Sequence, residues 1–415
     1  MKEKLEILSN TIVSYSLKVK ENDRVLIESA YEAKPLLIQL VKDISKVGGI
    51  PVVRLSDSMI EGLQNELATL SRVPEMKAQA KYDVEHFDCF IRIRYLDNEY
   101  NSKNIKSEYR KALGDATEEI HRIRINERRW TLLNYPSDLD AFKAKMTTED
   151  FQKYAMDVMT IDYQKMSDMI KPLKELMEKT DQVHIVGPNT DITFSIKGIP
   201  AIPCCGTANI PDGECYTAPV RDSVNGTITY NTPCPYQGNI YHNVSLTFEN
   251  GKIVKATCDE DQEKLNEIFD TDEGARYVGE FSFGLNPAIR EPMGDILYDE
   301  KIIGSIHFTP GSAYQDAFNG NKSSIHWDMV LIQRPEYGGG EIYFDNVLIR
   351  KDGKFLLDEL KPLNYENNDW SHFCVIFFLY ENNEITICFR QFVIKRLQKR
   401  FFPCYLEFGS KNELT

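Results

Sequence analysis

A histidine and an aspartate stand two residues apart in the segment SIHWDMVLIQ, as His326 and Asp328. If this segment is a strand, both side chains point to the same face, because side chains alternate along a strand. Apolar residues occupy most of both faces, which indicates a strand buried on both sides. A buried imidazole beside a carboxylate is costly unless the two are paired or bind a metal. Taken alone, the pair fits either a His–Asp hydrogen bond or one divalent ion.

Three further segments carry a polar side chain in a mainly apolar strand or in a turn. Glu280 lies in RYVGEFSFGLNP, where strand alternation places Ser282 on the same face. His307 lies in KIIGSIHFTPGSAY, and Tyr314 follows it after a Pro-Gly turn. Glu214 lies in the turn-rich segment NIPDGECYTAP. Each of these residues alone has a structural explanation at least as good as a functional one.

Considered together, these side chains favour a metal site. Two glutamates, two histidines and one aspartate form a mixed oxygen and nitrogen ligand set within residues 214–328. A single catalytic ion takes about three protein ligands, whereas a bridged pair takes about five or six. The set therefore predicts two divalent ions that share one carboxylate. Histidine with carboxylate suits zinc, cobalt, manganese or magnesium, so the metal is left open.

The segments that carry these residues resemble those of the thermophilic-type metalloaminopeptidases, the family of aminopeptidase T, aminopeptidase S and PepS-like proteins. NIPDGECYTAP, GEFSFGLNP, DEKIIGSIHFTPGSAY and SIHWD occur in the family's order and at similar spacing. RRWTLLNYPS, around Trp130, fits more weakly. The resemblance covers residues 1–363.

The resemblance implies a ligand set with Glu280 as the bridging carboxylate. Glu300, in the DEK before His307, corresponds to a further acidic ligand at a longer spacing, and is also a candidate to shuttle protons. Tyr314 is a ligand by resemblance, and two nearby cations would lower the pKa of its phenol. The implied catalytic residues are Glu280, Tyr314 and Glu300. The implied metal ligands are Glu214, Glu280, Glu300, His307, Tyr314, His326 and Asp328.

The implied function is hydrolysis of the N-terminal peptide bond of short peptides by water activated between two divalent ions. A free α-amine on the substrate, a homodimer and a cytoplasmic location are also implied. Two alternatives stay open: another dinuclear amidohydrolase or phosphoesterase, and a non-catalytic metal-stabilised binding protein. Arg221 follows the Glu214 segment, but the segments that carry His307 and His326 contain no arginine to clamp a phosphate, which disfavours the phosphoesterase.

The elements that must position these residues begin with an α/β region. Short apolar strands are expected at 25–28, 51–55 and 88–95, with an amphipathic helix at 33–47. Strand, helix and strand in this order form a βαβ unit, which implies a parallel sheet. The region has no GxGxxG and no P-loop, so it does not indicate a nucleotide site. We assign residues 1–125 to an N-terminal α/β domain.

A helical connection at 126–180 follows, within a mostly helical stretch that is interrupted near Trp130 and Pro136. Beyond residue 181, short β-rich runs alternate with Gly, Pro and Asn turns, which predicts a mainly antiparallel, β-rich catalytic domain at 181–363. Among these runs are 302–308, 325–332 and 341–349. The predicted fold class is therefore α/β plus β.

Composition excludes several classes of protein. The chain carries 63 acidic and 49 basic residues, a net charge of −14, which disfavours a nucleic-acid partner. No apolar run approaches the roughly 20 residues that span a membrane. The acidic N-terminal segment is unlike a signal peptide, and nine cysteines without a CxxC pair indicate reduced thiols in a cytoplasm. HExxH and GxSxG motifs are absent.

Residues 364–415 form an atypical aromatic-rich tail, in which 366–415 contain eight Phe, two Tyr and one Trp. Its apolar segments have no clean helix or strand period. Two explanations stand side by side: an appended apolar lobe or dimer contact, and an out-of-frame or read-through end.

Deletion of residues 366–415 separates these two explanations. An accidental tail predicts that the shortened protein keeps its hydrolytic rate and its oligomeric state, measured by substrate turnover and size-exclusion chromatography with light scattering. Loss of a stable dimer on deletion would instead show that the tail is structural.

Overall fold

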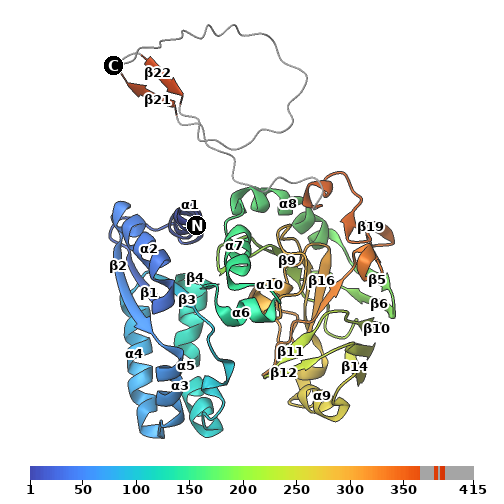
Figure 1. The fold of residues 1–415 in the computed structure, drawn as a ribbon. Helices are drawn as coiled ribbons and strands as arrows, with labels where there is room; N and C mark the ends of the chain where they lie inside the picture. The colour runs from blue at the N-terminus through green and yellow to red at the C-terminus, as the bar shows by residue number, and fades with distance from the viewer. Residues whose placement is uncertain (365–377, 382–383, 388–415) are drawn as a thin grey trace. The chain divides into compact units, whose positions relative to one another are not determined.

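Five parallel strands form the first sheet (sheet A) in the order β2-β1-β3-β4-β8 (Figure 1). The computed structural model describes residues 1–364, 378–381 and 384–387. The strands of sheet A are β1 Arg24–Ala30, β2 Ile50–Ser56, β3 Cys89–Arg94, β4 Arg129–Asn134 and β8 Asn209–Ile210. The predicted βαβ unit with a parallel sheet is confirmed.

Helices cover both faces of sheet A because successive side chains of a strand point to opposite faces. On β1, Ile27 belongs to the core that also contains Leu36 of α2, whereas Leu26 packs in a separate cluster with Val84 of α4 and Ile120 of α5. This two-faced burial explains the continuous apolar run in β1. The helices of this region are α1 Lys2–Asn10, α2 Lys34–Lys46, α3 Ser58–Glu66, α4 Val73–His86 and α5 Ser107–Glu127.

The expected interruption near Trp130 is a strand. Helix α5 ends at Glu127, and β4 then pairs in parallel with β3 and places Leu133 in the core. Ser137 caps the following helix, because its side chain and that of Asp140 exchange hydrogen bonds with each other's backbone N–H. Three helices complete the stretch: α6 Asp138–Lys143, α7 Thr148–Met159 and α8 Tyr163–Lys179.

The rest of the first unit consists mainly of two antiparallel sheets. Sheet B has the order β14-β13-β10-β6-β5-β18-β19-β20, with β5 Gln182–Gly187, β6 Thr190–Ser195, β10 Asn225–Thr229, β13 Ser245–Glu249, β14 Lys252–Thr257, β18 Glu341–Phe344, β19 Val347–Lys351 and β20 Lys354–Phe355. Sheet C has the order β17-β16-β15-β9-β7, with β7 Ile202–Cys204, β9 Glu214–Thr217, β15 Val278–Gly284, β16 Ser305–Pro310 and β17 Val330–Ile332. The predicted α/β plus β class is confirmed.

Smaller elements connect these sheets. They are the hairpin β11 Cys234–Tyr236 and β12 Asn239–Tyr241, and the helices α9 Gln262–Phe269 and α10 Ile296–Asp299. None of the described helices has both the length and the apolar composition needed to cross a membrane.

Two of the expected β runs differ in the structure. Only Val330–Ile332 of the run 325–332 forms a regular strand, and His326 joins Gly311 through an isolated bridge. The run 341–349 is a hairpin rather than one strand, because Asp345 and Asn346 turn the chain with φ angles of 46° and 67°.

A layer of aromatic side chains joins sheets B and C. The ring centroid of Phe194 on β6 lies 5.0 Å from that of Phe281 on β15 and 5.0 Å from that of Phe308 on β16. Phe248 and Phe344 of sheet B add contacts to Phe308 and Phe283. One face of sheet C is therefore filled by apolar rings, and the alternate side chains of β15 and β16 must point to the other face.

The chain divides into two compact units, Met1–Ser371 and His372–Thr415. In the second unit the structure describes one hairpin, formed by β21 Phe378–Glu381 and β22 Glu384–Ile387. Of the predicted tail, the structure also describes Asn364, and residues 365–377, 382–383 and 388–415 lie outside the described residues. The division of residues 1–363 at 125 and 180 stays a prediction.

Replacing Phe194 by alanine should destabilise the protein by about 3–5 kcal/mol, because the change leaves a cavity between two packed sheets. Chemical denaturation of the variant measures this loss. Thr193→Ala, at the exposed neighbouring position of the same strand, is the matched control and should change the free energy of unfolding by less than about 0.5 kcal/mol. Equal effects of the two substitutions would contradict the packing role of Phe194.

Candidate metal centre

The register of sheet C gathers polar side chains on the face opposite the aromatic layer. Ser282 of β15 lies beside His307 of β16 on one side and Tyr216 of β9 on the other. Two residues before Ser282 on β15, Glu280 faces Thr309 of β16. Two residues after Ser282, Gly284 faces Glu214 of β9. Side chains two residues apart share a face, so Glu214, Glu280 and His307 meet there, as strand alternation predicts.

Glu214, Glu280 and His307 form the first donor group. One ligand atom from each lies within 4.8 Å of the others. His307 Nε2 lies 2.9 Å from Glu280 Oε1 and 3.2 Å from Glu214 Oε2. The Ser282 hydroxyl donates a hydrogen bond to Glu214 Oε2 at 3.1 Å. All four side chains are buried.

Glu280, His326 and Asp328 form the second donor group, within the same 4.8 Å limit. His326 Nε2 lies 3.1 Å from Asp328 Oδ1 and 3.4 Å from Glu280 Oε2. The Thr309 hydroxyl donates to Asp328 Oδ1 at 2.8 Å. Glu280 thus belongs to both groups, and it faces each histidine with a different carboxylate oxygen.

Backbone carbonyls orient both imidazoles. His307 Nδ1 lies 3.1 Å from the carbonyl oxygen of Glu300, and His326 Nδ1 lies 2.8 Å from that of Ser312. A carbonyl oxygen only accepts, so we assign the proton to Nδ1 in both rings, which leaves Nε2 to face the carboxylates. His326 Nε2 is buried and makes no hydrogen bond. This orphaned nitrogen between carboxylates fits a metal ligand.

The charges in the site also require cations. Burial opposes a charge on His307, but its hydrogen bonds to Glu214 and Glu280 outweigh burial and raise the histidine pKa well above its usual range. Burial likewise opposes ionisation of Asp328, but His326 overcomes it and lowers the aspartate pKa. The carboxylates therefore hold positive charge between them, which protons or divalent ions can supply.

Glu300 lies beside this cluster, and its predicted role as a further ligand stays a prediction. Its carboxylate contacts the Lys301 ammonium and belongs to neither donor group, while its backbone carbonyl holds His307. Burial raises the pKa of Glu300 to about 8 despite Lys301. The ring of Tyr314 is half exposed and packs on His326 with the centroids 4.6 Å apart, and its role as a ligand stays a prediction.

Sequence reasoning missed Lys301 and a third donor group. Lys301 is fully buried, and its Nζ lies 3.7 Å from Glu214 Oε1. Cys204, Asp212 and Glu214 form the third group within 4.8 Å. Asp212 stands in a Pro-Asp-Gly sequence that is typical of a turn, and Lys301 follows two acidic residues as an ordinary surface lysine would. The one sequence feature that indicates burial of Lys301 is that two apolar residues, Ile302 and Ile303, directly follow it.

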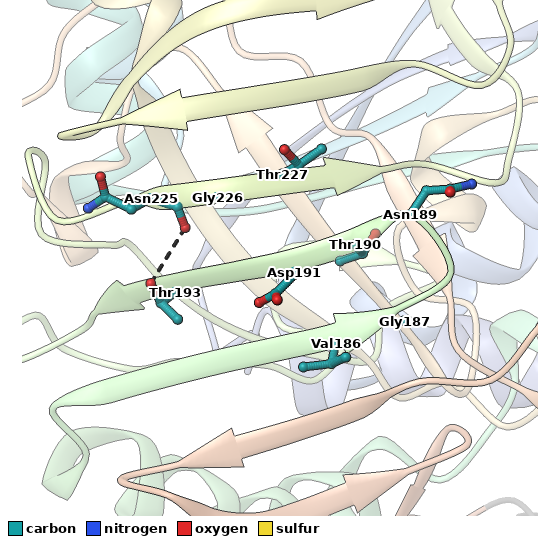
Figure 2. A pocket seen from close by; sticks show the side chains of 9 residues that line it. All are labelled: Val186, Gly187, Asn189, Thr190, Asp191, Thr193, Asn225, Gly226 and Thr227. Carbon is teal, nitrogen blue, oxygen red and sulfur yellow. Dashed lines mark hydrogen bonds between the residues drawn. The ribbon is translucent and has the colours of Figure 1, made fainter.

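A shallow groove of about 700 Å³ lies elsewhere, on sheet B. It runs over β5, β6 and β10 and is lined by polar side chains such as Asp191, Thr193 and Thr227 (Figure 2). None of the seven predicted site residues lines it. The donor groups lie on sheet C instead, where they form a candidate metal centre in a protein of α/β plus β architecture.

Comparisons with known proteins agree with this class. The family model described as "Thermophilic metalloprotease (M29)" matches residues 1–355. Aminopeptidase AmpS of Bacillus subtilis (strain 168) is 24% identical over 368 residues, 79% of this chain and 88% of the relative. Aminopeptidase PepS of Streptococcus thermophilus is 24% identical over 424 residues, 89% and 98% respectively. The solved structure of wild-type AmpT from Thermus thermophilus has a TM-score of 0.73 at 19% identity, covers 86% of this chain and all of that chain, and shows the same fold.

The chain belongs to the M29 thermophilic metalloprotease family, since the family model spans most of its length. It is therefore a metal-dependent enzyme that hydrolyses peptide bonds. The predicted resemblance to the metalloaminopeptidases of the aminopeptidase T and aminopeptidase S type is confirmed.

Thr309 should support the second donor group through its hydrogen bond to Asp328. Thr309→Val keeps the side-chain shape but removes the hydroxyl, so we expect metal affinity to fall about 10–100-fold, as for other partners of metal ligands. Competition with a chromophoric chelator measures the affinity. Thr309→Ser, which retains the hydroxyl, should bind metal nearly as well as the unaltered protein. Equal affinity of the valine and serine variants would refute this role.

Proposed function

We propose that this enzyme is an aminopeptidase that removes the first residue of short peptides with two divalent ions. Glu214, Glu280 and His307 would hold one ion, and Glu280, His326 and Asp328 the other. The observation that carries this proposal is the position of Glu280, whose two oxygens face two different histidines at 2.9 and 3.4 Å. A carboxylate shared in this way is the feature expected of a bridged pair.

When bound, the two ions would polarise the scissile carbonyl and favour ionisation of the attacking water. The protein contributes a fixed arrangement of charges around them. Ser282 and Thr309 each hold one carboxylate by a hydrogen bond, and backbone carbonyls hold both imidazoles. Preorganised ligands of this kind need little rearrangement during the reaction. Zinc, cobalt, manganese and magnesium all stay compatible with the donors.

Tyr314 and Glu300 stay as proposed further ligands and catalytic residues. Tyr314 is the better placed to contact substrate, because its ring is half exposed beside His326. The carboxylate of Glu300 contacts Lys301, and its backbone carbonyl oxygen accepts a hydrogen bond from His307 Nδ1. Its contribution is therefore to ligand position and charge rather than to direct contact with a peptide.

Restriction to the first peptide bond would come from the free α-amine of the substrate. A protonated or metal-bound amine suits a site built from carboxylates, whereas an N-blocked peptide lacks this group. Relatives named aminopeptidases cover 79% and 89% of the chain, which supports exopeptidase activity. An assay that compares an aminoacyl-anilide with its N-acetylated form tests this directly, and equal cleavage of both would contradict it.

A cytoplasmic homodimer is the proposed state of the enzyme. One apolar surface supports the dimer: β2 is an edge strand of sheet A, and its Leu55 is exposed together with Met59, Ile60 and Leu63 of α3. An exposed apolar edge strand is a site where a second chain can pair.

Glu280→Gln is expected to lose more activity than the roughly 100-fold that outer partners of a metal ligand cost, because both ions lose a charged ligand. Metal analysis of the purified variant should give less bound metal than the unaltered protein. Glu263→Gln, at an exposed position of α9, removes the same charge outside the site and should alter neither measurement. A Glu280→Gln variant with full metal content would exclude the bridging role.

A further inference from the structure

The third donor group lies next to a cation that the protein itself provides. Lys301 is fully buried, its ammonium contacts Glu300, and its Nζ lies 3.7 Å from Glu214 Oε1. Among the three members of the group Cys204, Asp212 and Glu214, the lysine therefore lies against Glu214.

The two oxygens of the Glu214 carboxylate have different partners. Oε1 faces the Lys301 ammonium, whereas Oε2 accepts a hydrogen bond from Ser282 and faces His307. Only Oε2 is therefore directed into the first donor group. A carboxylate held at both oxygens cannot rotate freely toward a second cation on the side of Cys204.

The charges around the site give the lysine a second role. Five carboxylates lie in the three donor groups or beside Lys301, namely those of Asp212, Glu214, Glu280, Glu300 and Asp328. Lys301 contributes an ammonium group to this cluster. In a metal-loaded site, where the nearby cations favour ionisation of all five carboxylates and both histidines are neutral ligands, one ammonium leaves a net charge of −4, which two divalent ions neutralise. Without the lysine, the site would carry an excess negative charge beside a thiol and two carboxylates.

We propose that Lys301 is a positioning residue that serves as a built-in third cation: it fixes Glu214 and keeps a divalent ion out of the Cys204–Asp212–Glu214 group. This inference rests on the proposed two-ion function. In the unaltered enzyme the thiol of Cys204 binds no metal. Removal of the ammonium exposes a thiol and two carboxylates within 4.8 Å of one another, a set that suits a soft or borderline divalent ion.

Cobalt binding to the Lys301→Met variant tests the proposal. Methionine is uncharged and fills a similar volume, so the bound cobalt should rise from two ions to three per chain. A thiolate bound to cobalt gives a charge-transfer absorption in the near ultraviolet, because a coordinating thiol loses its proton. We expect this absorption in Lys301→Met and its disappearance in Lys301→Met with Cys204→Ser. Lys301→Arg keeps the positive charge and should bind two ions without the absorption.

The unaltered enzyme provides an independent test if Lys301→Met does not fold. Titrated with excess cobalt, it should stop at two ions and show no thiolate absorption, and such absorption would overturn the proposal. A folded Lys301→Met that binds two ions without the absorption would overturn it as well. Failure of the proposed function is distinguishable, because the unaltered enzyme would then bind fewer than two ions.

Discussion

Glu280 lies between two imidazoles that are turned toward it from different strands and loops, and each of its oxygens faces one of them. Several carboxylates are buried around this contact, an arrangement that is stable only when positive charge lies between them. The geometry of the site follows from this constraint. Hydrogen bonds from Ser282 and Thr309 hold the acids, and backbone carbonyls hold the bases.

The two antiparallel sheets make this arrangement possible. Aromatic rings of β6, β15 and β16 fill the space between sheets B and C, so the alternate positions of β15 and β16 are free to carry polar groups. Register then decides which groups meet. Ser282 faces His307 and Tyr216, and a shift of one residue would turn these side chains into the aromatic layer. Packing and chemistry are thus fixed by the same strand pairing.

Strand alternation predicted a large part of this site from the sequence. Glu280 and Ser282 share a face as expected, and so do His307 and Thr309 in the structure, because both pairs lie in regular strands. His326 and Asp328 also meet at Glu280, although the segment that carries them is not a regular strand. Their position depends on the hydrogen bond of His326 to Ser312 and on that of Thr309 to Asp328. These bonds link segments that are separated in the sequence.

Other features could not be predicted because they depend on the tertiary path of loops. Glu300 and Lys301 follow α10, where the chain turns inward and buries both charges against each other. Periodicity alone gives no sign of such a turn, so the sequence did not predict that Lys301 lies beside the donor groups. In the same way, β4 follows a long helix, and its pairing with β3 and β8 is a tertiary contact that the local sequence pattern does not show.

Anomalous diffraction from crystals of the zinc-loaded protein tests the central claim most directly. Two metal peaks about 3.5–4 Å apart are expected if Glu280 bridges two ions. One peak should lie against Glu214 and His307, the other against His326 and Asp328, and both should contact Glu280. A single peak, or two peaks of which only one contacts Glu280, would contradict the account.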